Sequence, residues 1–531
     1  MTNQLALEIY KTGVEPIVDV DGSLAQARVG SFATYWPGGL YGDTVIRVPH
    51  HPLAAWQVRK GQRLVLRNGA AVVYEGKITR LRAVYDRPSS TSYTLIFCRG
   101  YWEALLARRT WNKRWCDSRI SDDAWRIVTG LNGSEKCSID REGRLRFTPK
   151  GVAWSNSDYA QLIYSMPTGS TVKRFVLSYN LQEGAQAWQL GADVGATLEL
   201  NRTASGSGSS DVTTTTPNQN MDIFLMAKAG QTPTEDGTYF GEVSGLKVYS
   251  ELGGITPTSV MQNIRAYVAE LAATNVFIES NSLTLEPFMS DGQEFLTSIM
   301  LRAAGYGDSS YNAWAPLILA SELSGLGDGK PVLAFRQAAS IDGYDYAIRL
   351  DEDNVQLPIS IDDSLEAVSN WVAMNYEGES LRYVVTPDDD ANLKDTTSIT
   401  AWGELHQVLD VKDSDLTRAK QWARRHLKTR KDPSYNVAEA IRVRGTIRDS
   451  DGQPVPVCQV AAGARLKIEN YGADVAGVSG AGFTQLITST NYTPANGGEI
   501  TLNLGIPDRL AIMRNQRELG LASAGGAAAG R

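Results

Sequence analysis

The sequence predicts a mainly β protein with a minor α component, an α+β chain of several domains. Its 531 residues exceed what one hydrophobic core supports, so about three to five folded units are expected. Short alternating segments separated by turn residues recur near both ends and in the middle of the chain, as in antiparallel β domains. Helical periodicity is confined to a few shorter stretches.

The composition is that of an ordinary folded protein, with 42% hydrophobic and 21% charged residues. The net charge of -7 gives no general attraction to nucleic acid or to anionic membranes. The four cysteines and four histidines form no CxxC pair and lack zinc-ligand spacing, so we expect reduced thiols and neither a cofactor nor a metal.

The first residues, MTNQLALEIYKTG, lack the basic and then apolar pattern of a secretion signal. No apolar run is long enough to cross a bilayer. We therefore expect a protein that is made in the cytoplasm and is not stably inserted in a membrane.

Residues 1–108 are predicted to form a tube-like antiparallel β-barrel. The strand-like segments Thr44–Val48, Arg63–Leu66 and Tyr93–Phe97 alternate, and Arg67–Gly69 between them is a turn signal.

Residues 109–139 differ, because tryptophans and arginines interleave there and just before it. This connector is either a stacking surface for sugar or single-stranded nucleic acid, or a segment that packs on neighbouring domains or subunits. The packing interpretation is favoured, and the interface candidates are Trp102, Arg108, Trp111 and Trp115.

Residues 140–252 are predicted to form an inserted β-sandwich. Phe175–Tyr179, Ala196–Leu200, Met221–Met226 and Leu246–Tyr249 are strand-like. The small polar residues 204–216 between them predict an exposed, mobile loop. An insertion requires that its two ends lie close together.

A helical region is expected at 253–329. Thr256 is a helix N-cap followed by a proline at the first helical position, and Val260, Ile264 and Val268 recur at helical spacing. A second helix is expected to begin near Ser290, which forms a capping-box pattern with Gln293.

Three further segments complete the chain. Residues 330–435 are predicted to form a second α+β domain, with a hairpin at 371–385 and a helix from Leu416 to Leu427 that is basic on its outer face. Residues 436–515 are predicted to form a C-terminal β-barrel segment. Residues 516–531 are rich in alanine and glycine and are expected to be a flexible tail.

Two distant segments share one pattern. Gly61–Asn68 and Gly463–Asn470 both have the order Gly, any residue, Arg, Leu, any residue, aliphatic, any residue, Asn. The order continues with Ile78-Thr79 and Ile487-Thr488, then with Tyr85 and Tyr492. Any two hairpins share glycines and alternating aliphatics, but several matches in one order predict a duplicated barrel. Three copies of a chain with two like domains can build a pseudo-sixfold ring.

These segments resemble the baseplate hub, or tail-tip hub, proteins of phages. The resemblance is carried by Trp36–Gly39, Val58–Leu64, Tyr74–Ile78 and Arg99–Tyr101 near the start, and by Val460–Ile468, Leu486–Tyr492 and Ile500–Gly505 near the end. It covers roughly the first 110 residues and 330–515.

The resemblance implies a virion protein of the tail tip or baseplate that forms a homotrimer. Such trimers close a ring that joins the hexameric tail tube to a central spike or fibre and lines the channel for genome ejection. The implied partners are distal tail or tail tube proteins, the tape measure protein and the spike or fibre protein. DNA passes through transiently, without sequence-specific binding. In this picture 253–329 is a helical hub region and 330–435 the second hub domain.

The segment Gly241–Tyr249 resembles the last strand of jelly-roll carbohydrate-binding modules, which implies an accessory domain that faces a host surface glycan. The candidate stacking residues are Trp154, Tyr159 and Trp188, although aromatic residues more often lie in a core. The alternative function is therefore a glycan-binding or glycan-degrading tail protein that acts through this sandwich. We expect no catalytic residues, because no nucleophile elbow, HExxH helix or P-loop is present.

Overall fold

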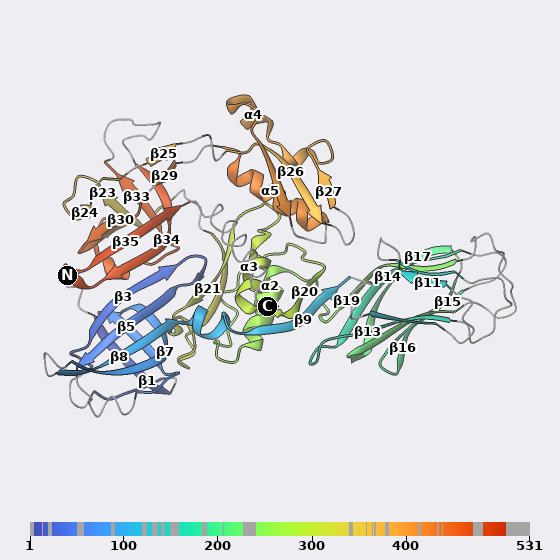
Figure 1. Ribbon diagram of the computed structural model, residues 1–531, viewed down its shortest axis with the longest axis horizontal. Helices are drawn as coiled ribbons and strands as arrows, with labels where there is room; N and C mark the ends of the chain where they lie inside the picture. Colours follow the sequence, from blue (N-terminus) through green and yellow to red (C-terminus); the bar gives the residue numbers. More distant parts are fainter. Residues whose placement is uncertain are drawn as a thin grey trace.

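The computed structural model confirms a mainly β protein with few helices (Figure 1). It describes residues 5–505 apart from 13, 20–23, 50–57, 87–90, 119–124, 130–135, 140–143, 149–158, 183–187, 205, 227–239, 339–342, 357, 360, 364, 366–367, 378–381, 412–415, 433–434, 438 and 471–481. The tail at 516–531 thus lies outside the described residues. Among the described residues, no helix is both long and apolar enough to cross a membrane.

The N-terminal unit is an antiparallel set of strands at the lower left of Figure 1. Its strands are β1 (Ala6–Thr12), β2 (Glu15–Pro16), β3 (Arg28–Tyr35), β5 (Tyr41–Pro49), β6 (Arg63–Asn68), β7 (Ala71–Asp86) and β8 (Thr91–Gly100). They pair in the order β2-β1-β6-β7-β8-β5-β3. Inward side chains such as Ile9, Ile46 and Leu64 are fully buried between them, which gives the strands their alternating pattern.

The C-terminal unit lies directly above it in Figure 1. Its strands are β23 (Tyr346–Arg349), β24 (Val355–Gln356), β25 (Ile361–Asp363), β29 (Tyr435–Val437), β30 (Ile441–Arg444), β31 (Thr446–Asp449), β32 (Pro454–Pro456), β33 (Arg465–Glu469), β34 (Phe483–Thr493) and β35 (Glu499–Gly505). Three of them, β23 to β25, come from before residue 436, so the unit begins earlier in the chain than expected.

The two units share one sheet, because β3 pairs with β34 from Phe32 opposite Tyr492 to Tyr35 opposite Ser489. Buried hydroxyls of Thr34 and Thr490 lie 2.7 Å apart across this junction. Within the described residues, the strand order stays open at its ends and closes no barrel. The expectation of two tube-like barrels is corrected accordingly, because β3 and the outer half of β34 pair with each other across the two units.

The strand order that the duplication predicts is confirmed. The N-terminal unit contains the order β3-β5-β8-β7-β6, and the C-terminal unit contains β24-β30-β35-β34-β33. In both units the glycine before the first strand of the repeat has a positive φ, +86° at Gly61 and +93° at Gly463. The Gly61 amide donates to the carbonyl of Ile78 over 2.7 Å, and the Gly463 amide donates to Ile487 over the same distance.

The two units also share a β-bulge. The register shifts at Thr79 in β7 and at Thr488 in β34. Each threonine hydroxyl donates to the neighbouring strand, to the Phe97 carbonyl over 3.2 Å and to the Asn503 carbonyl over 3.0 Å. Bulges are local, specific departures from strand pairing, so a shared one is a strong sign of structural equivalence.

The bulge corrects one part of the sequence match. Counting from it, the counterpart of Tyr492 is Ala83, which lies opposite Thr94 as Tyr492 lies opposite Ile500. Tyr85 is therefore not the counterpart of Tyr492. The two tyrosines also differ in burial, since Tyr85 is 67% exposed and Tyr492 only 1%.

The inserted sandwich lies at the right of Figure 1 and stands apart from both units. One sheet has the order β10-β13-β18-β15-β16, and the other contains β11-β12-β19-β14-β17. The strands are β10 (Trp125–Thr129), β11 (Lys136–Ile139), β12 (Leu145–Thr148), β13 (Tyr159–Ser165), β14 (Val172–Gln182), β15 (Trp188–Val194), β16 (Thr197–Ala204), β17 (Gly206–Asn218), β18 (Asn220–Met226) and β19 (Phe240–Tyr249). Since β10 and β11 precede residue 140, the sandwich starts within the segment expected as a connector.

The chain enters and leaves the sandwich on neighbouring strands. Strand β9 (Thr110–Asp117) pairs with the end of β19, where Asp117 lies opposite Val248 and Cys116 opposite Tyr249. The ends of the insertion are therefore adjacent, as an insertion requires.

The prediction of a mobile loop at 204–216 is wrong for most of these residues. Residues Gly206–Asn218 form β17, which pairs with β14 from Leu181 opposite Gly206 onward. A side chain at Gly208 would meet the Tyr179 hydroxyl at 2.4 Å, so the Tyr179 side chain lies across this glycine. The polar residues suit an edge strand with one exposed face.

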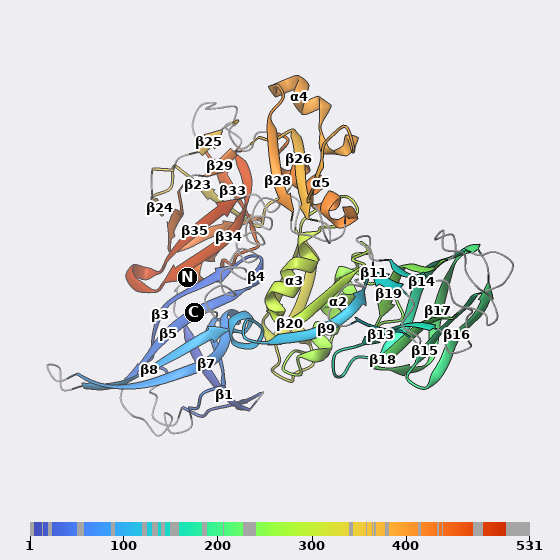
Figure 2. The same cartoon turned by 45° about the vertical axis from the view of Figure 1, so that its right-hand side comes forward.

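The centre of the molecule is the helical region (Figure 2). Helix α2 (Pro257–Tyr267) has Thr256 as its N-cap and a proline at its start, as the sequence predicts, and Ser259 completes a capping box. The second helix, α3 (Leu296–Gly305), begins later than expected. Ser290 instead lies in β20 (Phe288–Phe295), which pairs with β9 from a distant part of the chain. Strands β21 (Trp314–Leu319), β22 (Val332–Gln337) and β4 (Gly38–Gly39) form a small sheet beside these helices.

A last module stands at the top of Figure 1. It contains β26 (Trp371–Glu377), β27 (Arg382–Val385), β28 (His406–Val411), α4 (Thr396–Trp402) and α5 (Leu416–Arg430). The predicted hairpin is confirmed, because β26 pairs antiparallel with β27. The basic side chains of α5 are not all on its outer face. Arg418 and Arg425 are buried, and Arg425 donates to the carbonyls of Ala304 and Gly305 at the end of α3.

Candidate functional site

The aromatic and basic segment is largely part of the core. Trp115 is fully buried and Trp102 is 4% exposed, and both pack against α2 and α3. Trp111 is partly exposed and stacks on Tyr267, with ring centroids 4.3 Å apart. Two of the four interface candidates therefore pack on the neighbouring domain of the same chain and present no free surface, whereas Arg108 is exposed.

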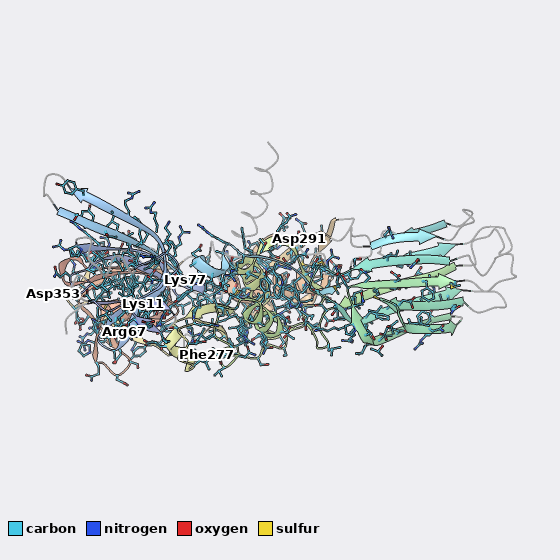
Figure 3. The ribbon with its side chains drawn as sticks, turned by 90° about the horizontal axis from the view of Figure 1, so that it is seen from below. Lys11, Arg67, Lys77, Phe277, Asp291 and Asp353 are labelled. Atoms are coloured by element: carbon cyan, nitrogen blue, oxygen red, sulfur yellow. The ribbon has the colours of Figure 1, made fainter. Side chains whose placement is uncertain are left out.

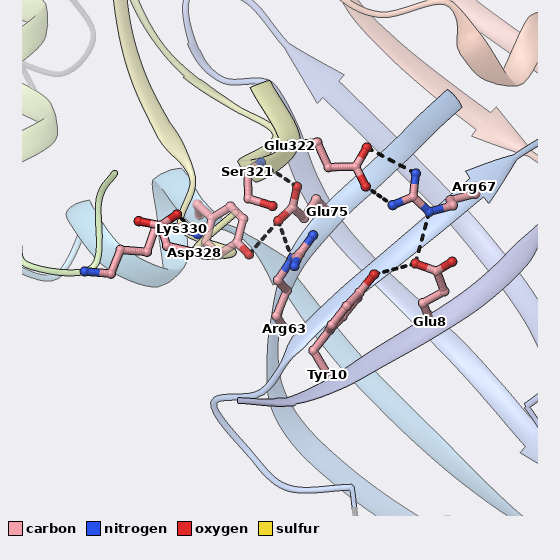
Figure 4. A network of polar contacts seen from close by, with 10 residues as sticks. Glu8, Tyr10, Arg63, Arg67, Glu75, Ser321, Glu322, Asp328 and Lys330 are labelled. Carbon is pink, nitrogen blue, oxygen red and sulfur yellow. Dashed lines mark hydrogen bonds and ion pairs between the residues drawn. The ribbon is translucent and has the colours of Figure 1, made fainter. Parts of the chain in front are cut away.

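A buried carboxylate holds the N-terminal unit to the central region (Figure 4). Glu75 on β7 has no exposed surface. It accepts hydrogen bonds from Arg63 Nε over 2.7 Å, from the Tyr101 hydroxyl over 3.0 Å and from the backbone amide of Ser321 over 2.8 Å. Burial raises the pKa of Tyr101, and the adjacent Glu75 raises it further, so this hydroxyl remains a donor. The network ties the unit's sheet to the loop after β21.

A second, more exposed network runs beside it (Figure 4). Arg67 on β6 bridges Glu322, in the same loop as Ser321, and Glu8 on β1, with its Nε 3.0 Å from Glu8 Oε2. Tyr10 donates to Glu8 over 2.6 Å. Burial opposes ionisation of Glu8, but the hydrogen bonds from Tyr10 and Arg67 leave its pKa below the usual range. Both networks fix the orientation of the N-terminal unit.

A cavity of about 570 Å³ lies at the base of the long β7–β8 hairpin. Its lining includes Lys77, Arg80, Arg99 and Arg108 together with the carboxylates of Asp43 and Glu103. Lys77 is labelled in Figure 3. Burial lowers the pKa of Lys77. The lining is therefore mixed in charge, and basic side chains outnumber acidic ones.

Beyond this cavity the hairpin projects as an arm, formed by Thr79–Asp86 of β7 and Thr91–Phe97 of β8 (Figures 1 and 3). Strand β6 covers β7 only as far as Lys77, opposite Arg63. Strand β5 covers the other side of the hairpin out to Tyr93, opposite Pro49. Among the described residues, the β7 edge from Arg80 onward has no strand beside it.

The outer face of the five-stranded sheet of the sandwich carries an aromatic platform. Phe224 on β18 lies opposite Gly191 on β15, and a side chain at Gly191 would meet the Phe224 ring at 2.0 Å. The ring therefore lies across the glycine. Inward neighbours such as Leu162 and Ile223 are fully buried, so Phe224 is on the opposite, outward face and is partly exposed.

Polar side chains surround this ring. Gln161 lies opposite Phe224 on β13, and Asp222 lies opposite Asp193 in the next outward row. Gln189 donates to Asn201 over 3.2 Å beside the ring. Burial raises the pKa of Asp222 and the charge of Asp193 raises it further, while Gln161 and Arg126 act in the opposite direction. An apolar ring among amide and carboxylate groups suits a sugar, which has both apolar faces and hydroxyl groups.

The stacking residues expected from the sequence are not among the side chains that the structure describes. Trp154 lies outside the described residues. Tyr159 and Trp188 lie at the starts of β13 and β15, and their side chains are outside the described set. Phe224 and Gly191 are 33 positions apart in the sequence, and only strand pairing brings them together. Within the described ranges, no cluster of three His, Cys, Asp or Glu side chains could hold a metal.

Neither a protein-family model nor a curated protein sequence matches this chain. Several solved structures are similar over nearly its whole length. One is the tail protein from Neisseria meningitidis MC58, with a TM-score of 0.40 and 9% identity over 94% of this chain and 96% of that chain. Another is the 43 kDa tail protein of prophage MuSo2 from Shewanella oneidensis, with a TM-score of 0.37 and 11% identity over 92% and 98%.

The sandwich alone has a different set of similar structures. The family 11 carbohydrate-binding module of the Clostridium thermocellum cellulase Lic26A-Cel5E matches 27% of this chain and 98% of its own length, at 13% identity and a TM-score of 0.18. Such low identities and TM-scores leave the function to be inferred from the chain's own architecture.

Proposed function

We propose that the protein is a non-enzymatic structural subunit of a phage-type tail tip, a baseplate hub that assembles as a ring of three copies. The observation that supports this most is the duplicated five-strand unit. One chain contributes two like units joined edge to edge in a single sheet. Three chains would then contribute six like units, which can match a sixfold partner such as a tail tube.

The remaining architecture suits a scaffold. The Glu75 network fixes the N-terminal unit against the central region, so the two units and that region can act as one body. The sandwich is attached through two adjacent strands and stands clear of the units, so it can vary without disturbing a ring. In this proposal the protein resides in the virion and contacts tube, tape measure and spike or fibre proteins.

The mass of the purified full-length chain in solution tests this proposal. Light scattering or sedimentation is expected to give three chains in a particle. A chain that remains monomeric at concentrations where assembly is measured would contradict the ring.

A second function is supported by a separate observation, the platform formed by Phe224 across Gly191. We propose that the sandwich binds a glycan on this outer face. The ring would stack on the apolar face of a sugar, and Gln161, Asp222 and Asn201 would bind its hydroxyl groups.

A further inference from the structure

Among the described residues, the counterparts of the two strand edges that join the units have no strand beside them. Within the chain, β3 of the first unit pairs with the outer half of β34 of the second. The counterpart of β34 is β7, by the shared bulge at Thr79 and Thr488. From Arg80 onward, its corresponding edge is unpaired among the described residues.

The counterpart of β3 is found by counting across the paired strands. Ile46 on β5 lies opposite Ile96, and Ile441 on β30 lies opposite Leu502, at matching distances from the bulge. The pairs β24–β30 and β25–β29 belong to two different sheets but share one antiparallel register, because both sides advance by the same number of residues from one pair to the other. The pairing of β3 with β5 has two register shifts that cancel at Thr34, so the same count of residues applies at that position.

The match is specific to single residues. Thr34 lies opposite Tyr41, which is five residues before Ile46. Asp362 lies opposite Asn436, which is five residues before Ile441. Thr34 and Asp362 are therefore counterparts, and β25 is the counterpart of the part of β3 that joins the units. In the described residues, β25 pairs with β29 alone, so its other edge is also unpaired.

We propose that β25 of one copy pairs with the β7 edge of a neighbouring copy, repeating between chains the β3–β34 junction found within each chain. This inference rests on the proposed ring and names its interface. Within the chain, the junction pairs Tyr35 with Ser489, Thr34 with Thr490 and Ala33 with Asn491. When each residue is replaced by its counterpart, the contact between chains places Asp363 opposite Arg80, Asp362 opposite Leu81 and Ile361 opposite Arg82.

Charge supports this register. The β25 sequence contains two aspartates, Asp362 and Asp363, and the β7 edge carries two exposed arginines, Arg80 and Arg82. The translated register places Asp363 directly opposite Arg80, and opposite charges facing each other across strands are favourable. Inside the chain the same junction is uncharged, with Thr34 and Thr490 at its centre. The charged pair in the contact between chains thus distinguishes it from the uncharged contact within a chain.

The positions of the two edges allow a closed assembly. β25 is at the far end of the C-terminal unit and β7 is at the opposite end of the N-terminal unit, in both Figure 1 and Figure 2. One chain therefore cannot pair these edges with each other. A head-to-tail contact that repeats a fixed rotation closes into a ring when the rotation permits.

Disulfide trapping tests the register in the full-length protein. The double variant Arg80→Cys with Asp363→Cys should form disulfides between chains under mild oxidation, giving covalent species up to three chains. The matched control is Arg80→Cys with Asp362→Cys, because neighbouring residues of a strand point to opposite faces. We expect about tenfold less crosslinking in this control, since its cysteine side chains point apart.

Charge exchange is a second measurement that needs no cysteine. Arg80→Asp should shift the assembly toward monomers, and adding Asp363→Arg in the same chain should restore it. Three-chain particles that give neither the register-specific crosslink nor the rescue would overturn this interface and leave the ring proposal standing. Monomers of the unmodified protein would overturn both.

Discussion

Glu75 connects two domains through a single carboxylate with no exposed surface. Its partners come from β6, from the start of the central region and from the loop after β21. A charge in such a place is stable only while its hydrogen-bond partners remain. The residue therefore fixes the orientation of the N-terminal unit, and with it the direction in which the arm projects.

Replacing Glu75 tests that role. Glu75→Ala leaves Arg63 and the Ser321 amide without their buried acceptor and should lower the free energy of unfolding by about 3–5 kcal/mol. The control Glu322→Ala removes a carboxylate that is 43% exposed, and should cost only about 0.2–1 kcal/mol. Urea unfolding measures both variants. Equal, small losses would show that the buried network does not hold the units together.

Phe224 is the residue that the glycan proposal depends on. Phe224→Ala should weaken binding of neutral β-linked oligosaccharides by about tenfold or more, which corresponds to about 1.4 kcal/mol of lost stacking. Isothermal titration calorimetry with a panel of such oligosaccharides measures the change. Thr213→Ala, an exposed position on the other sheet, is the control and should bind as the unmodified chain does. If the unmodified chain binds none of the panel, or if Phe224→Ala binds equally well, the proposal fails.

At the scale of single elements, the features predicted correctly are local ones. The α2 helix is determined by Thr256, Pro257 and Ser259, and the β26–β27 hairpin by neighbouring strands. The errors depend on contacts between distant segments. Ser290 has a helix-capping pattern but pairs within β20 against β9. The Gly/Ser-rich residues of β17 are held in a strand by β14.

The candidate sites also divide into features that depend on local sequence and features that depend on contacts between distant segments. The internal repeat is readable because both copies keep the same glycine, arginine and aliphatic pattern. The platform at Phe224 and the unpaired edge at Arg80 depend on which strands become neighbours, and the sequence does not specify that locally. The tryptophans at 102 and 115 were more conspicuous in the sequence, yet they belong to the core.

The insertion point of the sandwich can be tested by two deletions. Replacing residues 118–247 by an Asn-Gly turn joins Asp117 to Val248, which already lie opposite each other and need only a tight turn. This variant should fold and retain the oligomeric state of the full chain.

The matched control removes 140–252, the boundaries expected from the sequence. That deletion leaves β10 and β11 without their partners and removes Tyr249, which is buried and donates to Glu286 over 2.8 Å. It should expose apolar surface and aggregate. Size-exclusion chromatography compares the two, and the opposite ranking would show that the sandwich ends elsewhere.

At the scale of the whole molecule, the arrangement combines a repeated sheet with an attached module. The two units share one sheet and one open strand order, the central region fixes them, and the sandwich stands outside (Figures 1 and 2). The edges of β7 and β25 that have no strand beside them among the described residues are what an assembly of several copies would use. A monomeric binding protein would have little need for a repeated unit whose edges remain uncovered.

An electron-microscopy average of the purified particle tests the central claim most directly. Three chains should produce six similar lobes around a central opening, with three sandwiches projecting outward and β25 meeting β7 at alternate boundaries between lobes. Particles that contain one chain, or rings held together by the sandwiches with the unit edges facing solvent, would contradict the account.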